Sequence, residues 1–429
     1  MRNNDRKLES ATGLEHQLNV LLLEQDEDYA LFLKQFIESH LPVSVTLVHT
    51  TVNARRVLTS SPKKFFIGIT SVLNVETTEF DKVNLLGEFQ VPVIAIVNEF
   101  EDEMRDQLIK HHVIDYVVKD NQIESTYICD LISRIHKNRD ITVLVVDDSK
   151  VSRFVIVREL ILQQFKVLEA ENGVEALALL QTNPDIKLVL VDNQMPNMDG
   201  YTFVSKAREL YSKDQLSIIG LSTSNEARLT VKFLKAGAND FIVKPFNYEI
   251  LLCRITQNLD MLDAVDYAKK LAYTDYLSGV NNRRYFFEQG EKVMHSAAAE
   301  EAFTVMMFDI DFFKKINDQF GHDVGDRVIK NFASLLRTHF AEDIVARIGG
   351  EEFAVISTST EYLFDLDYVD RFRALIEKQT LSVDDRNLKF TCSIGVCNIK
   401  GKSLDAMLRQ ADTYLYQAKL DGRNQIQAS

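Results

Sequence analysis

Short apolar runs alternate with amphipathic stretches along the first part of the chain. The runs occupy residues 18–23, 65–70, 91–97 and 115–118, and patterns with helical spacing separate them. Uninterrupted apolar runs of this length predict strands that are buried on both faces, and the helices between them predict a parallel sheet covered on both sides. The pattern therefore predicts an α/β fold.

The same succession of runs occurs again between residues 141 and 245, as TVLVVDD, KLVLVD, LSIIGLS and DFIVKP. An order that repeats at the spacing of one small domain predicts two tandem copies of one doubly wound fold. A short charged segment at residues 136–140 marks the joint between them. We therefore expect a polar tail at residues 1–17, a first copy at 18–138 and a second copy at 139–260.

A continuous helical pattern follows from Tyr248 to Thr274, with no proline or glycine inside it. It is interpreted either as the last helix of the second copy continued into a linker at residues 261–274, or as a helix that pairs with its twin in a dimer. The two interpretations are compatible. The apolar residues that recur three or four positions apart are Leu251, Ile255, Leu259, Leu262, Val265 and Ala268.

The remaining residues, 275–429, predict a third α/β domain. The run FTVMMFDI predicts a strand, and IVARIGGEEFAVIS predicts a hairpin with two glycines at its turn. The stretch ADTYLYQAKL predicts a helix that ends before Gly422. Three domains are also what a chain of 429 residues suggests.

The composition bears on the binding partners, the cysteines and the cellular location that we expect. Hydrophobic residues make up 46% of the chain, which is enough for packed cores, and the formal net charge of −14 argues against wide binding of nucleic acid or anionic membrane. The four cysteines show no CxxC or zinc-type spacing and are expected to be free thiols. No signal-peptide core and no run of about 18 apolar residues occurs, so we expect a cytoplasmic protein without membrane insertion.

Polar side chains follow the strands of the second copy. Asp147 and Asp148 come directly after one strand, Asp192 and Ser222 end two others, and Lys244 follows a fourth. Because the carboxyl ends of parallel strands meet at one edge of a sheet, these side chains should share a pocket. Three carboxylates suit Mg²⁺, a hard cation that prefers oxygen ligands.

In this order the residues resemble the CheY-like receiver domain of two-component response regulators, over about residues 139–260. The resemblance implies a Mg²⁺ site formed by Asp147, Asp148 and Asp192. It also implies that Asp192 attacks a phosphoryl donor and becomes an aspartyl phosphate. The donor would be a cognate histidine kinase or phosphotransfer protein.

Three further residues take receiver roles by the same resemblance. Ser222 and Lys244 would hold the oxygens of the new phosphoryl group. Phe241 matches the aromatic switch position of the family, although a core phenylalanine on a strand fits equally well. The sequence does not indicate whether phosphorylation activates or represses.

The first copy is interpreted as a degenerate pseudo-receiver. Neither Thr70 nor Ser71, which stand near the expected phosphoacceptor position, is a carboxylate nucleophile. We expect this copy to act by packing, as a dimer surface, an adaptor or a docking site. In this copy Gln25 stands where the second copy has Asp148, and Asn98 takes the place of the hydroxyl residue. The residues that remain are Glu24 and Asp26 of the acidic cluster, Tyr116 and Lys119.

The third domain carries acids beside glycines. The segment GGEEF at residues 349–353 places two carboxylates at a hairpin tip, where glycine lets the backbone turn tightly and approach a ligand. Upstream, FDID at residues 308–311 ends a strand with two more acids. Acids at a strand end are a common way to hold Mg²⁺ against phosphate.

With FDIDFFKKINDQFGHDVGD before it and YQAKLDGRN after it, this segment resembles the GGDEF domain of diguanylate cyclases, a nucleotide-cyclase-like α/β fold, over about residues 272–429. The resemblance implies synthesis of cyclic di-GMP from two GTP. Asp309, Glu351 and the carbonyl of Ile310 would hold Mg²⁺ or Mn²⁺. Glu351 or Glu352 would help deprotonate the ribose 3′-hydroxyl.

The substrate contacts also follow from the resemblance. Asn317 and Asp326 would read the guanine edge, and His322 lies between them, although a helix-capping histidine fits as well. Since one domain cannot close the cyclic product, catalysis implies a homodimer. The residues that would contact phosphates are Lys314, Lys419 and Arg423.

Two departures from related proteins matter. PleD-type regulators, with the same receiver–receiver–GGDEF order, have their intact receiver first, whereas this chain has it second. Many cyclases bind inhibitory product at an RxxD motif, but here the segment is FAED, with Phe340 at the arginine position and Asp343 at its end. Arg337 lies nearby, and Arg371 is a candidate for a secondary product contact.

A catalytically silent GGDEF domain that only senses GTP or cyclic di-GMP is the alternative interpretation. The intact GGEEF segment, Asp309, Asn317 and Asp326 favour an enzyme instead, because degenerate members of the family usually lose these residues.

Overall fold

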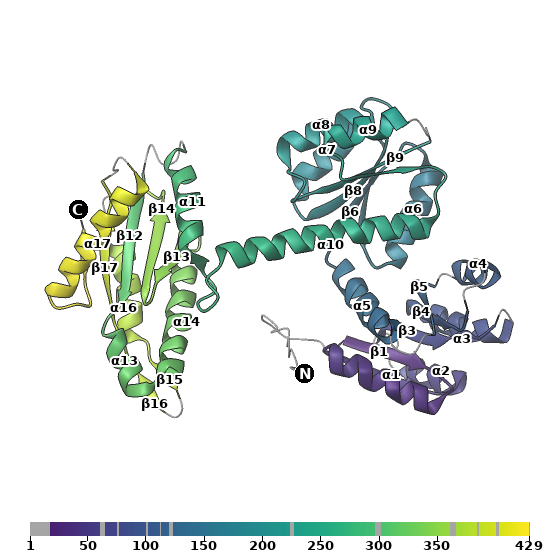
Figure 1. The fold of residues 1–429 in the computed structure, drawn as a ribbon, viewed down its shortest axis with the longest axis horizontal. Coiled ribbons are helices and arrows are strands. Elements are labelled where there is room, and N and C mark those ends of the chain that lie inside the picture. Colours follow the sequence, from purple (N-terminus) through teal and green to yellow (C-terminus); the bar gives the residue numbers. More distant parts are fainter. Residues whose placement is uncertain are drawn as a thin grey trace. The chain divides into compact units, whose positions relative to one another are not determined.

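The computed structural model describes residues 18–60, 65–74, 77–99, 102–111, 113–119, 123–223, 227–296, 302–360, 366–383, 386–399 and 403–428. The chain divides into two compact units, Met1–Leu262 and Asp263–Ser429. Within the described ranges, the first unit contains two five-stranded sheets, and the second contains one six-stranded and one two-stranded sheet (Figure 1).

The first sheet is parallel, with the strand order β2-β1-β3-β4-β5. Three of the apolar runs found in the sequence form central strands that are largely buried on both faces, whereas the run that begins at Asp115 forms an edge strand that is only partly buried. The strands are β1 (Leu18–Leu23), β2 (Val43–Val48), β3 (Phe65–Ser71), β4 (Val93–Val97) and β5 (Asp115–Val118). The helices are α1 (Glu27–His40), α2 (Thr51–Ser60), α3 (Thr77–Glu88), α4 (Asp102–Lys110) and α5 (Ile123–Asn138).

The second sheet repeats this topology, with the order β10-β9-β8-β6-β7. Ser149 begins α6, because its side chain accepts a hydrogen bond from the backbone N–H of Ser152. The strands are β6 (Thr142–Val146), β7 (Lys166–Ala170), β8 (Ile186–Asp192), β9 (Ser217–Ser222) and β10 (Asp240–Val243). The helices before α10 are α6 (Lys150–Leu162), α7 (Gly173–Thr182), α8 (Gly200–Leu210) and α9 (Ala227–Ala236).

The predicted long helix is α10 (Tyr248–Tyr273), and the boundary between the two units falls inside it. Its first part buries one apolar stripe against the second sheet, made of Leu251, Ile255, Leu259 and Leu262. Met261, Tyr267 and Leu271 are exposed. Helix α10 is therefore a receiver helix over its first half and presents apolar side chains to solvent beyond it.

The second unit has a mixed sheet with the order β11-β13-β14-β12-β17-β18. Its strands are β11 (Asn281–Asn282), β12 (Thr304–Ile310), β13 (Ile344–Gly349), β14 (Glu352–Ser357), β17 (Cys392–Cys397) and β18 (Ile426–Ala428), and the small sheet pairs β15 (Leu381–Val383) with β16 (Arg386–Leu388). The helices are α11 (Arg283–Met294), α13 (Phe313–Phe320), α14 (His322–His339), α16 (Asp367–Lys378) and α17 (Leu404–Leu420).

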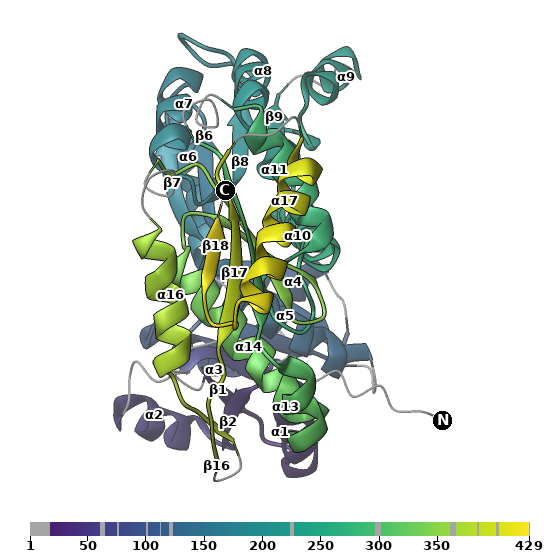
Figure 2. The same cartoon turned by 90° about the vertical axis from the view of Figure 1, so that its left-hand side faces the viewer.

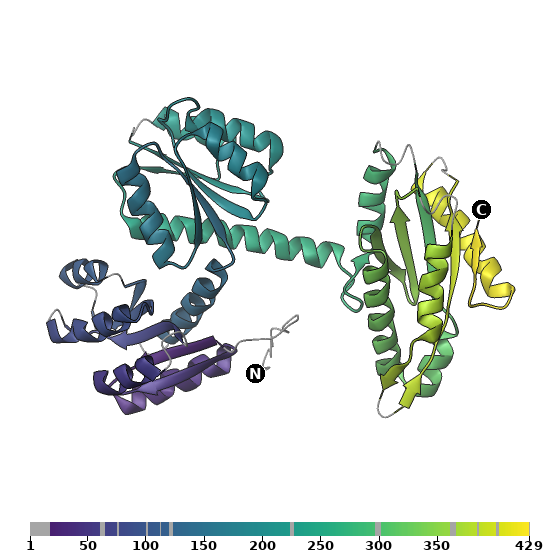
Figure 3. The ribbon, with the colours of Figure 1, turned by 180° about the vertical axis from the view of Figure 1, so that it is seen from behind.

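Helices cover both faces of this mixed sheet. Figure 2 shows α17 beside β17 and β18, and its apolar side chains share one core with those of α11. Figure 3 shows α14 and α16 on the other face, where Phe332 and Phe372 join a second core with Phe308 and Phe353 from the strands. This packing fixes the end of β12 and the β13–β14 turn, which carry the candidate metal ligands.

The predicted fold class is confirmed: two doubly wound α/β folds precede a third α/β domain. Helix α5 ends at Asn138, inside the charged segment at residues 136–140, and β6 begins at Thr142, just after this segment. None of the helices in the described ranges is long and apolar enough to cross a membrane.

Candidate functional site

The strand ends of the second copy bring the predicted receiver residues together. Val146 pairs with Val191, which sets Asp147 beside Asp192. Val243 pairs with Ser222, which leads Lys244 to the same edge. The Lys244 ammonium donates to Asp147 Oδ2 at 2.7 Å and to Asp192 Oδ1 at 2.5 Å. One ammonium therefore bridges two buried carboxylates at the expected position.

Burial and charge oppose each other in this pocket. Burial raises the pKa of the Asp192 carboxyl, while the hydrogen bond from Lys244 works in the other direction. Burial alone would lower the pKa of Lys244, but its hydrogen bonds to Asp147 and Asp192 outweigh burial and raise it. Lys244 therefore stays charged, and it partly neutralises the two buried carboxylates that it contacts.

The other predicted receiver residues are Asp148, Ser222 and Phe241. Asp148 is exposed and follows the buried Asp147, and Ser222 is buried at the end of β9. Phe241 is half-buried and packs against Phe233, with ring centroids 5.2 Å apart. This position suits both a switch aromatic and a core phenylalanine.

The first copy has a different arrangement at its strand ends. Leu23 pairs with Thr70, so Ser71 stands where the second copy has Asp192. The Ser71 hydroxyl donates to the buried Glu24 carboxylate, and the ammonium of Lys82, from α3, donates to the Ser71 carbonyl at 3.2 Å. Lys119 lies over the Tyr29 ring, 3.9 Å from its centroid. No carboxylate occupies the phosphoacceptor position of this copy.

One residue of the first copy differs from the sequence interpretation. Val118 pairs with Val97 as Val243 pairs with Ser222, so Val97 takes the place of the hydroxyl residue. Asn98 follows one position later. The error is one of register, because a one-residue shift along an apolar strand leaves little trace in the sequence.

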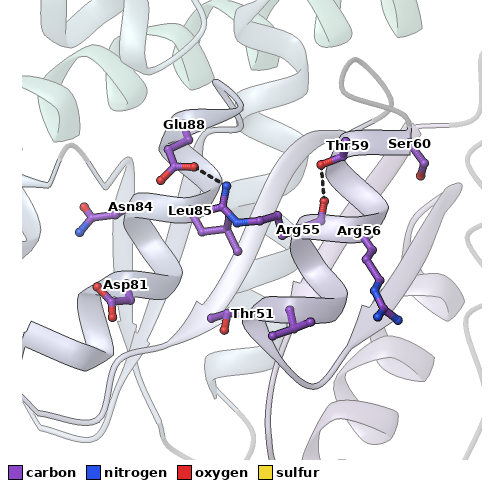
Figure 4. A pocket seen from close by; sticks show the side chains of 10 residues that line it. Thr51, Arg55, Arg56, Thr59, Ser60, Asp81, Asn84, Leu85 and Glu88 are labelled. Carbon is purple, nitrogen blue, oxygen red and sulfur yellow. Dashed lines mark hydrogen bonds and ion pairs between the residues drawn. The ribbon is translucent and has the colours of Figure 1, made fainter.

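A groove in the first copy lies apart from these strand ends. It has a volume of about 700 Å³ and runs between α2 and α3 (Figure 4). Arg55 reaches across it to Glu88 at 2.8 Å, and the Thr59 hydroxyl donates to the Arg55 carbonyl. The Arg55 and Glu88 side chains are both more than half exposed, which makes this a solvated surface pair.

The GGEEF segment forms the β13–β14 turn in the second unit. The backbone of Gly350 has φ +49, a conformation that residues with a side chain rarely adopt. The turn therefore requires glycine at this position. Arg347 donates twice to the Gly350 carbonyl, at 2.8 and 2.6 Å, and to Asp275 at 2.9 Å. The sequence analysis did not identify Arg347 or Asp275, which lie 72 positions apart.

This link predicts a test of the turn. Asp275→Ala should lower the stability of the cyclase domain by about 1.5–3 kcal/mol, since the largely buried Arg347 loses a charged hydrogen-bond partner. Calorimetry of the full chain measures the loss, and Ser278→Ala, which removes a neutral donor to Asp275, should cost less. An unchanged melting transition for Asp275→Ala would contradict the proposed support.

The carboxylates at the end of β12 face the turn. Asp309 pairs across the sheet with Glu352, and the Lys419 ammonium lies 2.7 Å from Asp309 Oδ2. Burial raises the pKa of Asp309 to about 6, against the opposing hydrogen bond from Lys419, and burial also raises the pKa of Glu352. Glu351 lies half-buried at the turn.

The donor set fits a divalent cation. Desolvated carboxylates that lie close together repel one another. A hard cation that binds their oxygens removes this repulsion. The carbonyl of Ile310, at the end of β12, is the additional ligand that the sequence predicted. Across the described ranges, no group of three or more His, Cys, Asp or Glu side chains is already arranged to hold a metal ion. Lysine ammonium groups contact the carboxylates at both sites.

Asp311 is a structural acid that sequence reasoning left without a role. Its buried carboxylate accepts from the Thr391 hydroxyl at 2.7 Å, the Ser393 hydroxyl at 2.6 Å and the backbone N–H of Asn424 at 3.0 Å. These bonds tie β12 to the segment that carries Arg423. Asp309 therefore faces the candidate metal site, whereas Asp311, two residues later, holds the end of β12 in place.

The predicted substrate residues lie on α13, on α14, at the end of α17 and on the segment after α17. Asn317 is on α13, and the side-chain oxygen of Asn317 is buried without a hydrogen-bond partner among the described residues. His322 and Asp326 are exposed on the first turns of α14, and Lys314 is exposed on α13. Arg423 lies over the exposed ring of Phe312, 4.5 Å from its centroid.

The segment that replaces the RxxD motif is part of the core. Phe340 is 1% exposed and packs against Phe308, Tyr368 and Phe372. Arginine at this position would place a charge in an aromatic core rather than create a surface contact. Arg337 is exposed one turn earlier. Arg371 lies over the Tyr368 ring at 5.1 Å.

Comparisons with known proteins point to the same two regions. Residues 143–256 match the response regulator receiver domain, and residues 272–425 match the diguanylate cyclase GGDEF domain. The response regulator PleD of Caulobacter vibrioides is 32% identical over 306 residues, which cover 66% of this chain and 65% of PleD. Diguanylate cyclase A of Treponema denticola is 32% identical over 167 residues, which cover 37% of this chain and 45% of that relative.

A solved structure agrees with these matches. The structure of a two-component response regulator with a GGDEF domain has a TM-score of 0.52 and 34% identity, and covers 58% of this chain and 100% of its own. The chain matches slightly less than two thirds of PleD's length. The resemblance predicted from the motifs is confirmed: the chain belongs to the PleD-like response regulators that combine receiver and GGDEF domains.

Proposed function

We propose that this protein is a diguanylate cyclase that converts two GTP into cyclic di-GMP and two diphosphates under the control of phosphorylation at Asp192. The observation that carries the proposal is the pairing of Asp309 with Glu352 beside the Arg347-supported GGEEF turn, with Lys419 directed at Asp309. Acids and a lysine at this place suit a metal-bound triphosphate.

The receiver step follows from the strand-end pocket. A carboxylate oxygen of Asp192 attacks the phosphorus of a phosphodonor, and the bond from phosphorus to the donor's leaving group breaks. Lys244, already in contact with Asp192, holds one oxygen of the transferred group, and Ser222 at the end of β9 holds another. Mg²⁺ held by Asp147, Asp148 and Asp192 would offset the charge of the phosphoryl group when bound.

The cyclase step needs two domains. In each, the ribose 3′-oxygen of one GTP attacks the α-phosphorus of the other, diphosphate leaves, and Glu351 or Glu352 accepts the proton. The raised pKa of Glu352 suits a proton acceptor near neutral pH.

Asn317, His322 and Asp326 bind the guanine, and Lys314, Lys419 and Arg423 bind phosphates. Mg²⁺ or Mn²⁺ at Asp309, Glu351 and the Ile310 carbonyl would stabilise the charge that develops on the phosphates.

Two chains must therefore meet, and α10 is the element that we assign to this contact. Beyond Leu262 its apolar residues are no longer covered by the receiver core, and Met261 and Leu271 are each about two-thirds exposed. A helix that exposes apolar side chains in this way is suited to pair with the same helix of a second chain. In this proposal phosphorylation changes how two chains pair, and pairing sets the cyclase rate.

Contacts within the first unit suggest an adaptor role for the pseudo-receiver. Arg105 of α4 makes a two-pronged ion pair with Glu249, at the start of α10, with a shortest distance of 2.7 Å. Arg134 of α5 pairs with Asp260, three turns along α10. The pseudo-receiver therefore holds the same helix that we assign to dimer formation.

The direct test is incubation of the purified chain with GTP and Mg²⁺, followed by detection of cyclic di-GMP and diphosphate. We expect both products, and a rate per chain that rises with protein concentration as dimers form. Binding of GTP without either product would instead support a silent sensing module.

Product inhibition should be weak in this protein. Phe340 stands where RxxD cyclases have the arginine that binds product phosphates, so this protein lacks that contact. The loss of one charge-assisted contact weakens the binding of product about ten- to a hundred-fold. Titration of cyclic di-GMP into a steady-state assay measures the effect, and Arg371→Ala should abolish any residual inhibition. Strong inhibition by product at concentrations that stop RxxD-bearing cyclases would contradict the expectation.

A further inference from the structure

Gly325 lies inside α14, where glycine is not the natural choice. Glycine in a helix interior costs about 1 kcal/mol relative to alanine. Its backbone is not in the left-handed region, unlike that of Gly321, which has φ +88. The conformation of the chain therefore does not explain this glycine, and the reason must lie in the space beside it.

That space is taken by the side chain of Asn317. A β-carbon built on Gly325 would lie 1.9 Å from Asn317 Oδ1, 3.0 Å from Asn317 Cγ and 3.2 Å from Phe313 Cζ. Real β-carbons do not approach other atoms so closely, and Asn317 would have to move. By contrast, a β-carbon on Gly321, at the turn between α13 and α14, would meet nothing within 4 Å.

Asn317 is itself poised for a ligand. Its amide oxygen is buried and has no hydrogen-bond partner in the part of the chain that the structure describes. A buried polar atom without a partner costs about 1–3 kcal/mol, which is tolerated most readily where a ligand or water completes the bonding. Its backbone carbonyl accepts from Gly321 N at 2.9 Å, which anchors the residue at the end of α13.

We infer that Gly325 is a positioning residue for guanine recognition: by lacking a side chain it creates the recess that holds the Asn317 amide. The inference rests on the proposed function, in which Asn317 and Asp326 bind the base. Asp326 is the next residue along α14, so one helical turn supplies both the recess and the second base contact.

The expected result is a selective loss of substrate affinity. Gly325→Ala displaces the amide and removes a neutral hydrogen bond to the base, which is worth about 0.5–1.5 kcal/mol, so the KM for GTP and the GTP dissociation constant should each rise roughly two- to ten-fold. The metal ligands and the lysines remain in place. The kcat at saturating GTP should therefore change by less than about two-fold, because the lost contact is made equally in ground and transition states.

Two glycine-to-alanine variants serve as matched controls. Gly87→Ala, in α3, meets nothing within 4 Å, so it should leave the KM unchanged and should not lower stability. Gly290→Ala, in α11, would bring a β-carbon to 2.4 Å from Ile356 Cδ1, away from the base site. It should lower the melting temperature without raising the KM, which separates a packing defect from a positioning defect.

A double-mutant cycle tests whether Gly325 acts through Asn317. In Asn317→Ala the recess is empty, so adding Gly325→Ala should raise the KM no further, and the two effects should be strongly non-additive. The double variant also removes the clash with the Asn317 amide and leaves only the 3.2 Å contact with Phe313 Cζ, so we expect it to fold even if Gly325→Ala alone does not.

Two results would overturn the inference. One is a wild-type KM and GTP dissociation constant for Gly325→Ala. The other is an effect of the same size on the Asn317→Ala background. Binding of GTP, measured by calorimetry on the full chain, keeps this test separate from the proposed activity. If the protein binds GTP but makes no cyclic di-GMP, the activity fails while the Gly325 comparison still stands. If it binds no GTP, both fail.

Discussion

Replacing Asp309 by alanine is expected to reduce cyclic di-GMP synthesis by at least about 10²–10³-fold, the loss seen when one electrostatic stabiliser of a transition state is removed. Asp309 faces Glu352 across the β12–β14 pair and contacts Lys419. Its removal takes away a metal ligand and leaves Lys419 without its partner in the site. The measurement is the initial rate of product formation at saturating GTP and Mg²⁺.

The fold should survive this substitution. Burial raises the pKa of Asp309 to about 6, so at neutral pH its ionised form is less favourable in the folded than in the unfolded chain. The carboxylate therefore opposes folding above that pH, and its loss should not lower the melting temperature.

Asp311→Ala is the matched control for Asp309→Ala. It removes the acceptor of three hydrogen bonds and leaves buried donors unpaired, and so it should destabilise the domain strongly. Near-wild-type activity in Asp309→Ala would exclude the metal assignment. A lower melting temperature in Asp309→Ala than in Asp311→Ala would reverse the roles that we give to the two acids.

The strand-end chemistry was predictable from the sequence because it depends on local features. Apolar runs define where strands stop, and a parallel sheet then brings Asp147, Asp192 and Lys244 to one edge whatever the details of the packing. The GGEEF turn was predictable for a similar reason, since two glycines between apolar strands indicate a hairpin.

Contacts between distant segments were not predictable in this way. Arg347 and Asp275 are far apart in the sequence, and neither has a pattern that indicates its partner. The position of Val97 depends on strand register, which a uniformly apolar strand does not fix. The burial of Phe340 among Phe308, Tyr368 and Phe372 was not predictable either, because these rings meet only when the helices are packed.

Asp192→Asn is expected to abolish the response of the protein to phosphodonors. An amide oxygen is not a nucleophile towards phosphorus, so acetyl phosphate should label the wild-type chain at Asp192 and leave the variant unlabelled. Beryllofluoride, which mimics the phosphoryl group, should change the dimer population or the cyclase rate of the wild type alone. The pocket itself should persist, because Lys244 keeps its 2.7 Å contact with Asp147.

Ser71→Ala provides the matched control for this switch, because Ser71 occupies the same position of the pseudo-receiver. It should respond to the phosphodonor like the wild type, since Ser71 already hydrogen-bonds the buried Glu24 and the first copy presents no carboxylate there. Mass spectrometry locates the modified residue, and sedimentation with the cyclase assay reads the consequence. If Asp192→Asn still responds while Ser71→Ala does not, the phosphoacceptor lies in the first copy and our assignment of the two copies is inverted. If both variants respond, the phosphodonor acts outside both strand-end pockets, and Lys244 and Ser222 are framework residues rather than parts of a switch.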